Sequence, residues 1–228
     1  MLIHNIPLEN EFREKLLQND YARLQFSQLG EDTVIWHHFH DRKNGFYVDI
    51  GCHHPFRYSN TALLSLFNGW RGINIDLDQR AIAAFEASRP QDINLQLAIG
   101  PREDELAVTL FEDGAVNSLD QATAHHQATQ RPVLGQSLIK VRPLRAVLDQ
   151  YLPPNTQINF MNIDAEGWDH MVLESNDWHN YRPEMIAVET HNFDICNPAS
   201  NPTFQFLSQN GYRLTSHVVV TSIYQRVR

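Results

Sequence analysis

A short apolar run that ends in an acid and a glycine constrains the fold more than any other part of the chain. Residues 46–50, Phe-Tyr-Val-Asp-Ile, are mostly of the β-branched and aromatic types that favour a strand buried on both faces, and Gly51 follows them. Glycine permits a sharp turn and the close approach of a ligand. Residues 59–61, Ser-Asn-Thr, then offer an N-cap to an apolar stretch over 62–67. The local prediction is a strand, a glycine turn and a helix.

A second strand is predicted over residues 72–76, and it ends in Asp76. Nucleotide-binding folds use a carboxylate at this place to bind ribose hydroxyls. The first turn lacks the Gly-x-Gly-x-x-Gly pattern of a dinucleotide site, because Gly51 is followed by Cys-His-His-Pro. Those side chains would crowd a pyrophosphate. A ligand with ribose and adenine but no phosphate would fit, and S-adenosylmethionine is the common one; a buried strand and turn without a ligand is the alternative.

Helices and strands alternate around this unit. A charged amphipathic helix is predicted over 8–20, and a second helix begins near residue 27 and ends near residue 41. A helix over 79–88 and a strand over 93–100 follow the second strand. This alternation is typical of a doubly wound, mostly parallel α/β sheet.

The alternation is interrupted between residues 101 and 143. Two short extra strands, over 106–112 and 137–142, form a predicted small β insertion. Between them lies a polar segment, 119–131, with little apolar content, which we expect to be a mobile loop or a weak helix. Two interpretations of this segment remain, a lid over the substrate and a simple insertion without a function of its own.

The later part of the chain returns to alternating elements and ends in two adjacent strands, one of them antiparallel. The predicted elements are a helix that ends at 152, strands over 158–167, 185–191, 212–216 and 218–224, and helices over 168–175 and 202–209.

Composition and charge narrow the class of protein. A net charge of −9 argues against a nucleic-acid partner, since phosphate binding needs a basic surface. The apolar runs are strand-sized, so we expect no membrane span, and the amino terminus lacks the pattern of a secretory signal. Two cysteines are too few for a disulfide scaffold, and Cys52 is interpreted as a packing residue rather than a nucleophile. The expected location is the cytoplasm.

An ordered set of short motifs resembles the FkbM family of S-adenosylmethionine-dependent methyltransferases. The matching stretches are 26–32 (Phe-Ser-Gln-Leu-Gly-Glu-Asp), 48–51 (Val-Asp-Ile-Gly), 59–61, 69–76 (Gly-Trp-Arg-Gly-Ile-Asn-Ile-Asp), 98–100, 163–167 (Ile-Asp-Ala-Glu-Gly), 182–183, 188–189 and 210–212. The resemblance implies a class I, Rossmann-like methyltransferase fold with a seven-stranded sheet whose last strand is antiparallel. It also implies methyl transfer to a hydroxyl, typically on a sugar of a glycan, glycolipid or secondary metabolite. The Cys-His-His-Pro after Gly51 departs from the family, where smaller residues are common.

On this interpretation residues 1–44 are an N-terminal helical extension and residues 45–228 are the methyltransferase domain. Ligands of open α/β sheets bind at the carboxyl ends of the strands. The expected cofactor contacts at that edge are Asp49, Ile50, Gly51, Cys52, His53, Asn60, Thr61, Asp76, Leu77, Ala98, Ile99 and Asp164.

The acceptor is expected beside the strands that end near Asp164 and Glu189. A sugar hydroxyl is a very weak acid, so it needs a base or a metal ion. Asp164, His191 and Glu166 are the candidate catalytic residues, with His53 and His54 as weaker ones. Asp164, Glu189 and His191 could together hold Mg²⁺ or Mn²⁺.

Simpler explanations exist for the same side chains. Asp164 and Glu166 could cap the helix that begins near Trp168, because acids favour a helix N-terminus. His191 could be an ordinary polar residue at a strand end.

Two other functions remain open at this point. An NAD- or nucleotide-sugar-binding oxidoreductase is disfavoured by the missing glycines and by the absence of a Tyr-x-x-x-Lys pair. A non-catalytic adenosyl-binding or scaffolding domain is disfavoured by the acids on the acceptor side. The partner we expect is a small-molecule or glycan acceptor, and the sequence is compatible with a homo-oligomer without indicating one.

Overall fold

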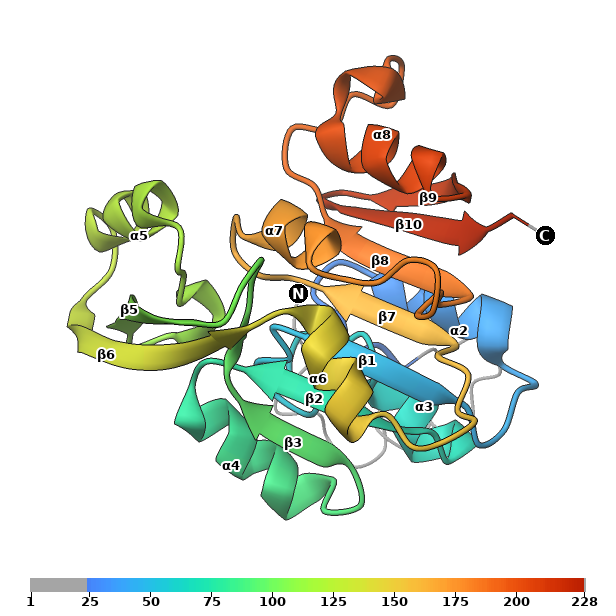
Figure 1. The fold of residues 1–228 in the computed structure, drawn as a ribbon, viewed down its shortest axis with the longest axis horizontal. Coiled ribbons are helices and arrows are strands. Elements are labelled where there is room, and N and C mark those ends of the chain that lie inside the picture. The colour runs from blue at the N-terminus through green and yellow to red at the C-terminus, as the bar shows by residue number, and fades with distance from the viewer. Residues whose placement is uncertain (1–23, 228) are drawn as a thin grey trace, which may run out of the picture.

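Seven strands form the central sheet, in the order β3-β2-β1-β7-β8-β10-β9 (Figure 1). The structure is a computed structural model that describes residues 24–227, so the helix predicted over 8–20 lies outside the described residues. The strands are β1 (Phe46–Ile50), β2 (Arg71–Asp76), β3 (Ile93–Gln96), β7 (Phe160–Ile163), β8 (Met185–Glu189), β9 (Tyr212–Val218) and β10 (Thr221–Arg226). β10 pairs antiparallel with both β8 and β9, and the other pairings in this sheet are parallel. The predicted mostly parallel sheet with an antiparallel final strand is confirmed.

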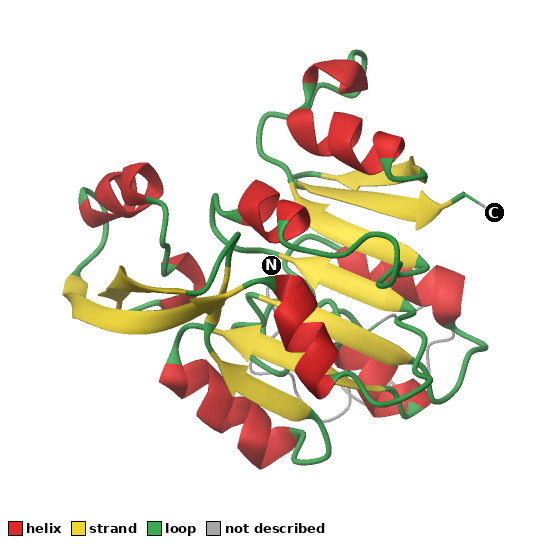
Figure 2. Cartoon of the chain, in the orientation of Figure 1, coloured by secondary structure: helices red, strands yellow, loops and turns green. Residues whose placement is uncertain are grey.

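Helices cover both faces of this sheet (Figure 2). They are α2 (Glu31–Phe39), α3 (Ala62–Asn68), α4 (Gln79–Ser88), α6 (Leu144–Tyr151), α7 (Asp169–Glu174) and α8 (Pro202–Gln209), the last preceded by the short turn η3 (Pro198–Ser200). Within the described residues, none of the helices is long and apolar enough to span a membrane.

The alternation of side chains along β1 explains why it is buried on both faces. Tyr47 packs into a cluster with Ile35 of α2, Leu64 of α3 and Trp70, while Val48 and Ile50 face the cluster that contains α6, α7 and α8. α2 therefore packs against the sheet, although it lies inside the predicted N-terminal extension. The domain boundary at residues 44 and 45 stays a prediction.

The strand predicted over 93–100 is in fact two strands in two sheets. β3 pairs with β2, and Leu97 N still donates to Asp76 O at 3.1 Å. β4 (Ala98–Ile99) then pairs with β6, and Gly100 N donates to Arg142 O at 3.0 Å. An alternating pattern shows which side chains are buried but not which strand lies beside them, so it cannot reveal this change of partner.

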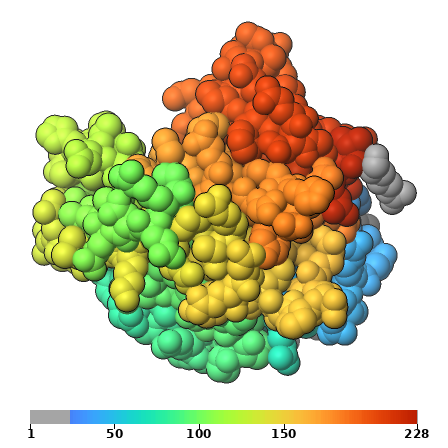
Figure 3. Space-filling view, in the orientation of Figure 1, coloured from blue at the N-terminus to red at the C-terminus, as the bar shows by residue number. Residues whose placement is uncertain are grey.

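The insertion is a small sheet in the order β4-β6-β5, with β5 (Asp104–Phe111) antiparallel to β6 (Val133–Arg142). Between these strands lie η2 (Gly114–Val116) and α5 (Gln121–Ala128). The polar segment 119–131 thus contains a helix, whose start is capped by Asp120, and Ala124 is its one buried residue. The insertion forms a lobe beside the main body (Figure 3).

Candidate active site

A cavity opens at the carboxyl ends of β1, β2, β7 and β8, where the strand order reverses between β1 and β7. All predicted cofactor residues except Thr61 line it, and so do Glu166 and Glu189. His191 and His54 do not. The sequence analysis missed several lining residues, which are Gln28, Tyr58, Ser59, Ile75, Leu97, Asp113, Gly114, Ala115, Val116, Asn117, Leu119, Arg131, Asn162, Ala165, Trp168 and Val172.

Gly51 is required by the packing of two strands against each other. Its φ of +73° lies in the left-handed region, and its N–H donates to Ile75 O at 2.9 Å. A Cβ added at Gly51 would lie 1.7 Å from the carbonyl oxygen of Asp164. The backbone after β7 thus lies where a side chain would go, while Gly51 itself also lines the cavity, so its role in the approach of a ligand stays a prediction.

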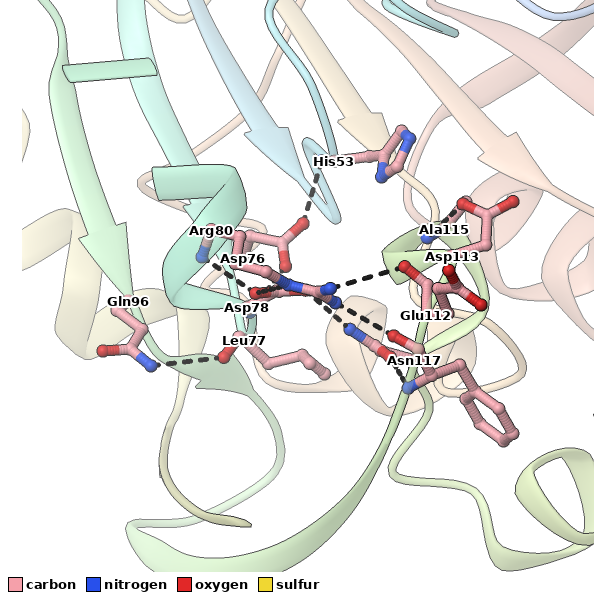
Figure 4. A network of polar contacts seen from close by, with 11 residues as sticks. His53, Asp76, Leu77, Asp78, Arg80, Gln96, Glu112, Asp113, Ala115 and Asn117 are labelled. Carbon is pink, nitrogen blue, oxygen red and sulfur yellow. Dashed lines mark hydrogen bonds and ion pairs between the residues drawn. The ribbon is translucent and has the colours of Figure 1, made fainter. Parts of the chain in front are cut away.

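Asp76 lies at the end of β2 with both oxygens already bonded to backbone. Oδ2 accepts from His53 N and Oδ1 accepts from Asp78 N, each at 2.8 Å (Figure 4). Burial, opposed by these two hydrogen bonds, raises the pKa of Asp76 to about 6. The side chain is thus fixed in one orientation, with its remaining lone pairs available to donors in the cavity.

The insertion is tied to this end of the cavity through Asp78. The Arg80 guanidinium contacts Asp78 Oδ2 at 2.6 Å and also donates to Phe111 O at 2.9 Å, while Asn117 Nδ2 donates to Asp78 Oδ2 at 3.1 Å (Figure 4). Burial disfavours the charge on Asp78, but the hydrogen bonds from Arg80 outweigh it and lower the pKa. This network brings the loop with η2 onto the cavity wall.

Asp49 lies at the centre of the edge and is 1% exposed. Its Oδ2 accepts from Thr61 Oγ1 at 2.9 Å and its Oδ1 accepts from Asn162 Nδ2 at 3.0 Å. Burial raises the pKa of this carboxyl despite both bonds. Because its hydroxyl is turned to Asp49, Thr61 does not cap α3, which starts at Ala62 without a side-chain cap. The predicted N-cap is therefore wrong.

Cys52 packs behind the turn, where it is 4% exposed and contacts Ile82 and Phe85 of α4. Burial raises the pKa of its thiol well above the ordinary value, which disfavours the nucleophilic thiolate. Its placement agrees with the interpretation as a packing residue, although its backbone reaches the cavity wall.

Three acids crowd the β7–β8 side of the cavity. Asp164 follows β7, Glu189 ends β8, and Glu166 lies on the turn between them, with a φ of +50°. Burial and the charge of Asp164 raise the pKa of Glu166 to about 8. Burial and the charge of Glu166 raise the pKa of Glu189 to about 8, and burial together with Glu189 raises that of Asp164 well above its ordinary value. Such carboxyls can exchange protons near neutral pH.

The helix-capping explanation for Asp164 and Glu166 is not what the structure shows. α7 begins without any side-chain cap, and the carboxylate of Asp169, its first residue, accepts instead from two N–H groups of the preceding turn, Ala165 N at 2.9 Å and Gly167 N at 3.2 Å. The backbone of Glu166 is held separately, since its carbonyl accepts from Ser118 Oγ at 2.7 Å. Neither acid is used as a cap for α7.

His191 lies outside the cavity. β8 ends at Glu189, so His191 falls in the following turn, where 61% of its side chain is exposed and Nε2 lies 3.1 Å from Glu189 Oε1. Among residues 24–227, no three carboxylate, imidazole or thiol side chains are arranged to hold a metal ion. Asp164, Glu189 and His191 therefore do not form the predicted ligand set in this structure, because the imidazole approaches Glu189 from outside the cavity.

The cavity wall carries buried polar atoms that have no hydrogen-bond partner within the described part of the chain. They are His53 Nε2, Asn60 Oδ1, Trp168 Nε1 and Glu189 Oε2. Buried polar groups are normally paired, since an unpaired one costs about 1–3 kcal/mol. These atoms fit a polar ligand that has both hydrogen-bond donors and hydrogen-bond acceptors, as S-adenosylmethionine and a hydroxyl-bearing substrate have.

Comparison with known proteins identifies the family to which the chain belongs. One solved structure that the chain resembles is the precorrin-6y C5,15-methyltransferase from Geobacter metallireducens GS-15, with a TM-score of 0.43 and 9% sequence identity over 86% of this chain and 87% of that chain. None of the curated proteins compared with the chain matches it. The family model described as the methyltransferase FkbM domain matches residues 49–214, which include the end of β1, all of β2, β7 and β8, and every cavity-lining residue but Gln28. The chain belongs to the FkbM methyltransferase family.

Proposed function

We propose that the chain is an S-adenosylmethionine-dependent O-methyltransferase acting on a hydroxyl, of a sugar in a glycan, glycolipid or secondary metabolite. One observation carries the proposal within the family. A single cavity has fixed acids, Asp76 and Asp49, at the ends of β2 and β1, and crowded acids with raised pKa values at the ends of β7 and β8. The first pair is suited to binding, and the second group is suited to proton transfer.

The binding half would hold the cofactor, which supplies an electrophilic methyl group on a sulfonium. Asp76 would accept hydrogen bonds from ribose hydroxyls, as acids at the end of a second strand do. Leu77 and Ile99 line the same wall and give the adenine an apolar surface. Gly51 and Cys52 would contact it through their backbone, whose position is fixed by N–H bonds to Ile75 O at 2.9 and 3.1 Å.

The acceptor half would orient the hydroxyl and take its proton. Asp164, Glu166 and Glu189 line the cavity, and a carboxyl with a pKa of about 8 is a stronger base than an ordinary one. His191 touches Glu189 and not the cavity, so its proposed role becomes orienting Glu189. In-line transfer needs the hydroxyl oxygen held against the methyl group, and the polar atoms of Trp168 and Glu189 are free to do so.

Binding separates the proposed cofactor from the oxidoreductase alternative. We expect S-adenosylmethionine and S-adenosylhomocysteine to bind in calorimetry and NAD to give no heat of binding at the same concentrations. Incubation with S-adenosylmethionine and a panel of glycans should then give a product heavier by one methylene group, detected by mass spectrometry. Tight binding of NAD alone would favour the oxidoreductase. Cofactor binding without any methylated product across the panel would favour the non-catalytic binding domain.

A chelator separates the two versions of the chemistry. If Asp164, Glu189 and His191 gather around Mg²⁺ or Mn²⁺ when substrates bind, activity should vanish in EDTA and return with either ion. If a carboxylate acts alone, turnover should survive dialysis against EDTA unchanged. Titration of the dialysed protein with Mn²⁺ in a calorimeter also measures directly whether the ion binds.

A further inference from the structure

The buried Arg89 begins a chain of hydrogen bonds that ends at the cavity wall. Arg89 follows α4 and is 2% exposed. Its Nη1 donates to Thr61 Oγ1 at 2.9 Å, Thr61 Oγ1 donates to Asp49 Oδ2 at 2.9 Å, and Asn162 Nδ2 donates to Asp49 Oδ1 at 3.0 Å. Asn60 Nδ2 in turn donates to Asn162 Oδ1 at 2.9 Å.

The chemistry of these groups allows one direction only. Arg89 has N–H donors and no acceptor, so Thr61 Oγ1 must accept from it and give its own proton to Asp49. The charge of Arg89 and the hydrogen bonds from Thr61 and Asn162 favour the ionised form of Asp49 against its burial, and in that form the carboxylate only accepts. The amide of Asn162 then turns its NH₂ toward Asp49 and its oxygen toward Asn60. Asn60 must then turn its NH₂ toward Asn162.

The last atom of this chain is left without a partner. Asn60 lines the cavity, and its Oδ1 is buried and has no hydrogen-bond partner among residues 24–227. Because the amide orientation is set from Arg89, this atom of a cavity-lining residue is an acceptor and not a donor. Asn60 lies beside the middle of the sheet edge, since its Nδ2 bonds Asn162 of β7, which pairs with β1.

We infer that Arg89 and Thr61 are positioning residues which, through Asp49 and Asn162, fix Asn60 Oδ1 as the acceptor for the ammonium group of the cofactor. The inference rests on the proposed function, because it requires an adenosyl ligand with an amino-acid arm. Arg89 also holds the loop that carries Asn60, since Nη2 donates to Pro55 O and to Ser59 Oγ at 3.3 Å. A single buried cation therefore sets both the position and the polarity of this contact.

The choice of ligands makes the inference testable. S-adenosylhomocysteine has the ammonium group, whereas 5′-methylthioadenosine has the same adenosyl thioether without the amino-acid arm. Thr61→Val removes the hydroxyl link to Asp49 and Asn60→Ala removes the acceptor. We expect each change to lower the affinity for S-adenosylhomocysteine by about tenfold, which is the effect of losing one hydrogen bond to a charged group. The affinity for 5′-methylthioadenosine should change by less than about threefold.

Two further variants serve as controls in the same calorimetric measurement. Thr61→Ser keeps the hydroxyl and should restore affinity to within about threefold of the wild type. Tyr47→Phe removes a different hydroxyl that Arg89 contacts, at 3.0 Å, which bonds Asp92 and does not belong to a residue that lines the cavity. It should lower the melting temperature and leave the affinity ratio of the two ligands unchanged.

Three outcomes would overturn the inference. Equal weakening of both ligands by Asn60→Ala or Thr61→Val would mean that the residues only support the fold. If folded Asn60→Ala protein binds both ligands as the wild type does, Asn60 Oδ1 is not the acceptor for the ammonium group. The Asn60→Ala result alone tests the inference if Thr61→Val does not fold. No binding of S-adenosylhomocysteine by the wild type would overturn the proposed function as well, whereas the first two outcomes leave that function intact.

Discussion

The two halves of the cavity contain the same kind of side chain in opposite situations. On the β2–β1 side, Asp76 accepts from two backbone N–H groups and Asp49 from two side chains. On the β7–β8 side, burial and the charge of Asp164 raise the pKa of Glu166 to about 8, and burial and the charge of Glu166 raise that of Glu189 to about 8. Hydrogen bonds fix an acid in place and partly offset the cost of its charge, whereas crowding leaves the charge costly and the proton exchangeable. Under the proposed function, the first half binds the cofactor and the second half, the reacting half, takes the proton of the acceptor hydroxyl.

Gly51 joins the two halves, so changing it should have the largest effect. Gly51→Ala would place Cβ 1.7 Å from Asp164 O, and the backbone must move. We expect a loss of roughly 3 kcal/mol or more in the free energy of unfolding, together with loss of cofactor binding and turnover. Urea denaturation followed by fluorescence measures this.

Gly69→Ala is the matched control for Gly51→Ala. Gly69 has a similar φ of +66°, but its added Cβ meets only Asn44 Oδ1, at 3.2 Å. It should cost about 1 kcal/mol, the price of a side chain in the left-handed region, and leave affinity unchanged. Equal losses in the two variants would show that backbone strain and not the contact with Asp164 explains the glycine.

Asp164→Asn tests the reacting half by itself. We expect turnover to fall by more than about tenfold, toward the 10²–10⁴ range of about 3–5 kcal/mol that general bases contribute, with S-adenosylhomocysteine affinity nearly unchanged. Removing this charge should also lower the pKa of Glu166, because Asp164 helps to raise it. Initial rates over a pH series give both results. Near-normal turnover in Asp164→Asn would move the assignment to Glu166 or Glu189.

Asp76→Ala tests the binding half. The variant loses hydrogen bonds to a charged group, so the binding free energy of S-adenosylhomocysteine measured by calorimetry should become less favourable by about 1–3 kcal/mol. Glu189→Gln, across the cavity, should change that affinity by less than about threefold. If Asp76→Ala retains full affinity while its melting curve shows an intact fold, Asp76 does not belong to the cofactor site, and the division into two halves fails.

The crowded acids should also give the protein an unusual dependence of stability on pH. The folded pKa values of Glu166 and Glu189, about 8, lie above the unfolded value of about 4.3, so the folded state binds more protons between these limits. Stability from this source is fully present below about pH 4.3 and is lost as pH rises through about 8. Melting temperatures of the wild type should fall over this window, and Glu166→Gln should flatten the fall.

Glu86→Gln, on an exposed position of α4, is the control for this measurement and should follow the wild-type curve. Turnover should rise over the same window with an apparent midpoint near 8, because the base must lose its proton. Turnover that stays constant over this window would count against Glu166 and Glu189 as the base.

The features that could be predicted from the sequence depend on local residue types. β1 and β2, with Gly51 and Asp76 at their ends, follow from apolar runs that stop at an acid or a glycine. The hydrogen bonds of Thr61 could not be predicted, because they depend on where Arg89 comes to lie in the fold. His191 was misplaced for a related reason, since a strand pattern does not show at which residue the chain leaves the sheet.

The sequence does contain a signal for the role of Asn162. This residue is a buried amide in the apolar run Phe-Met-Asn-Ile, where a polar side chain needs a partner, and its partners are Asp49 and Asn60. Arg89 gave no comparable signal, because an arginine before a proline at a helix end is usually exposed. The buried polar network around Asp49 is therefore one part of the site that the sequence analysis missed.

The smallest expected effect concerns the segment 119–131, whose first and last residues, Leu119 and Arg131, line the cavity. α5 buries Ala124, and its start contacts the turn after Asp164, where a Cβ on Gly167 would lie 2.9 Å from Thr123 Oγ1. With so little buried surface, its amides should exchange within seconds in the ligand-free protein and more slowly with S-adenosylhomocysteine and an acceptor bound. Hydrogen exchange with mass spectrometry measures this, and the peptide that covers β1 is the internal reference.

Ser118→Ala sharpens this last prediction, because Ser118 Oγ donates to Glu166 O at 2.7 Å and ties the segment to the reacting half. The variant should lose much of the ligand-dependent slowing in 119–131 and none of the protection in β1, since Ser118 lies outside the sheet. Strong protection of 119–131 in the ligand-free wild type would show that the segment is a packed element. A ligand-dependent change that survives in Ser118→Ala would show that the segment closes through other contacts, such as those of Asp120 and Thr123 with Gly167.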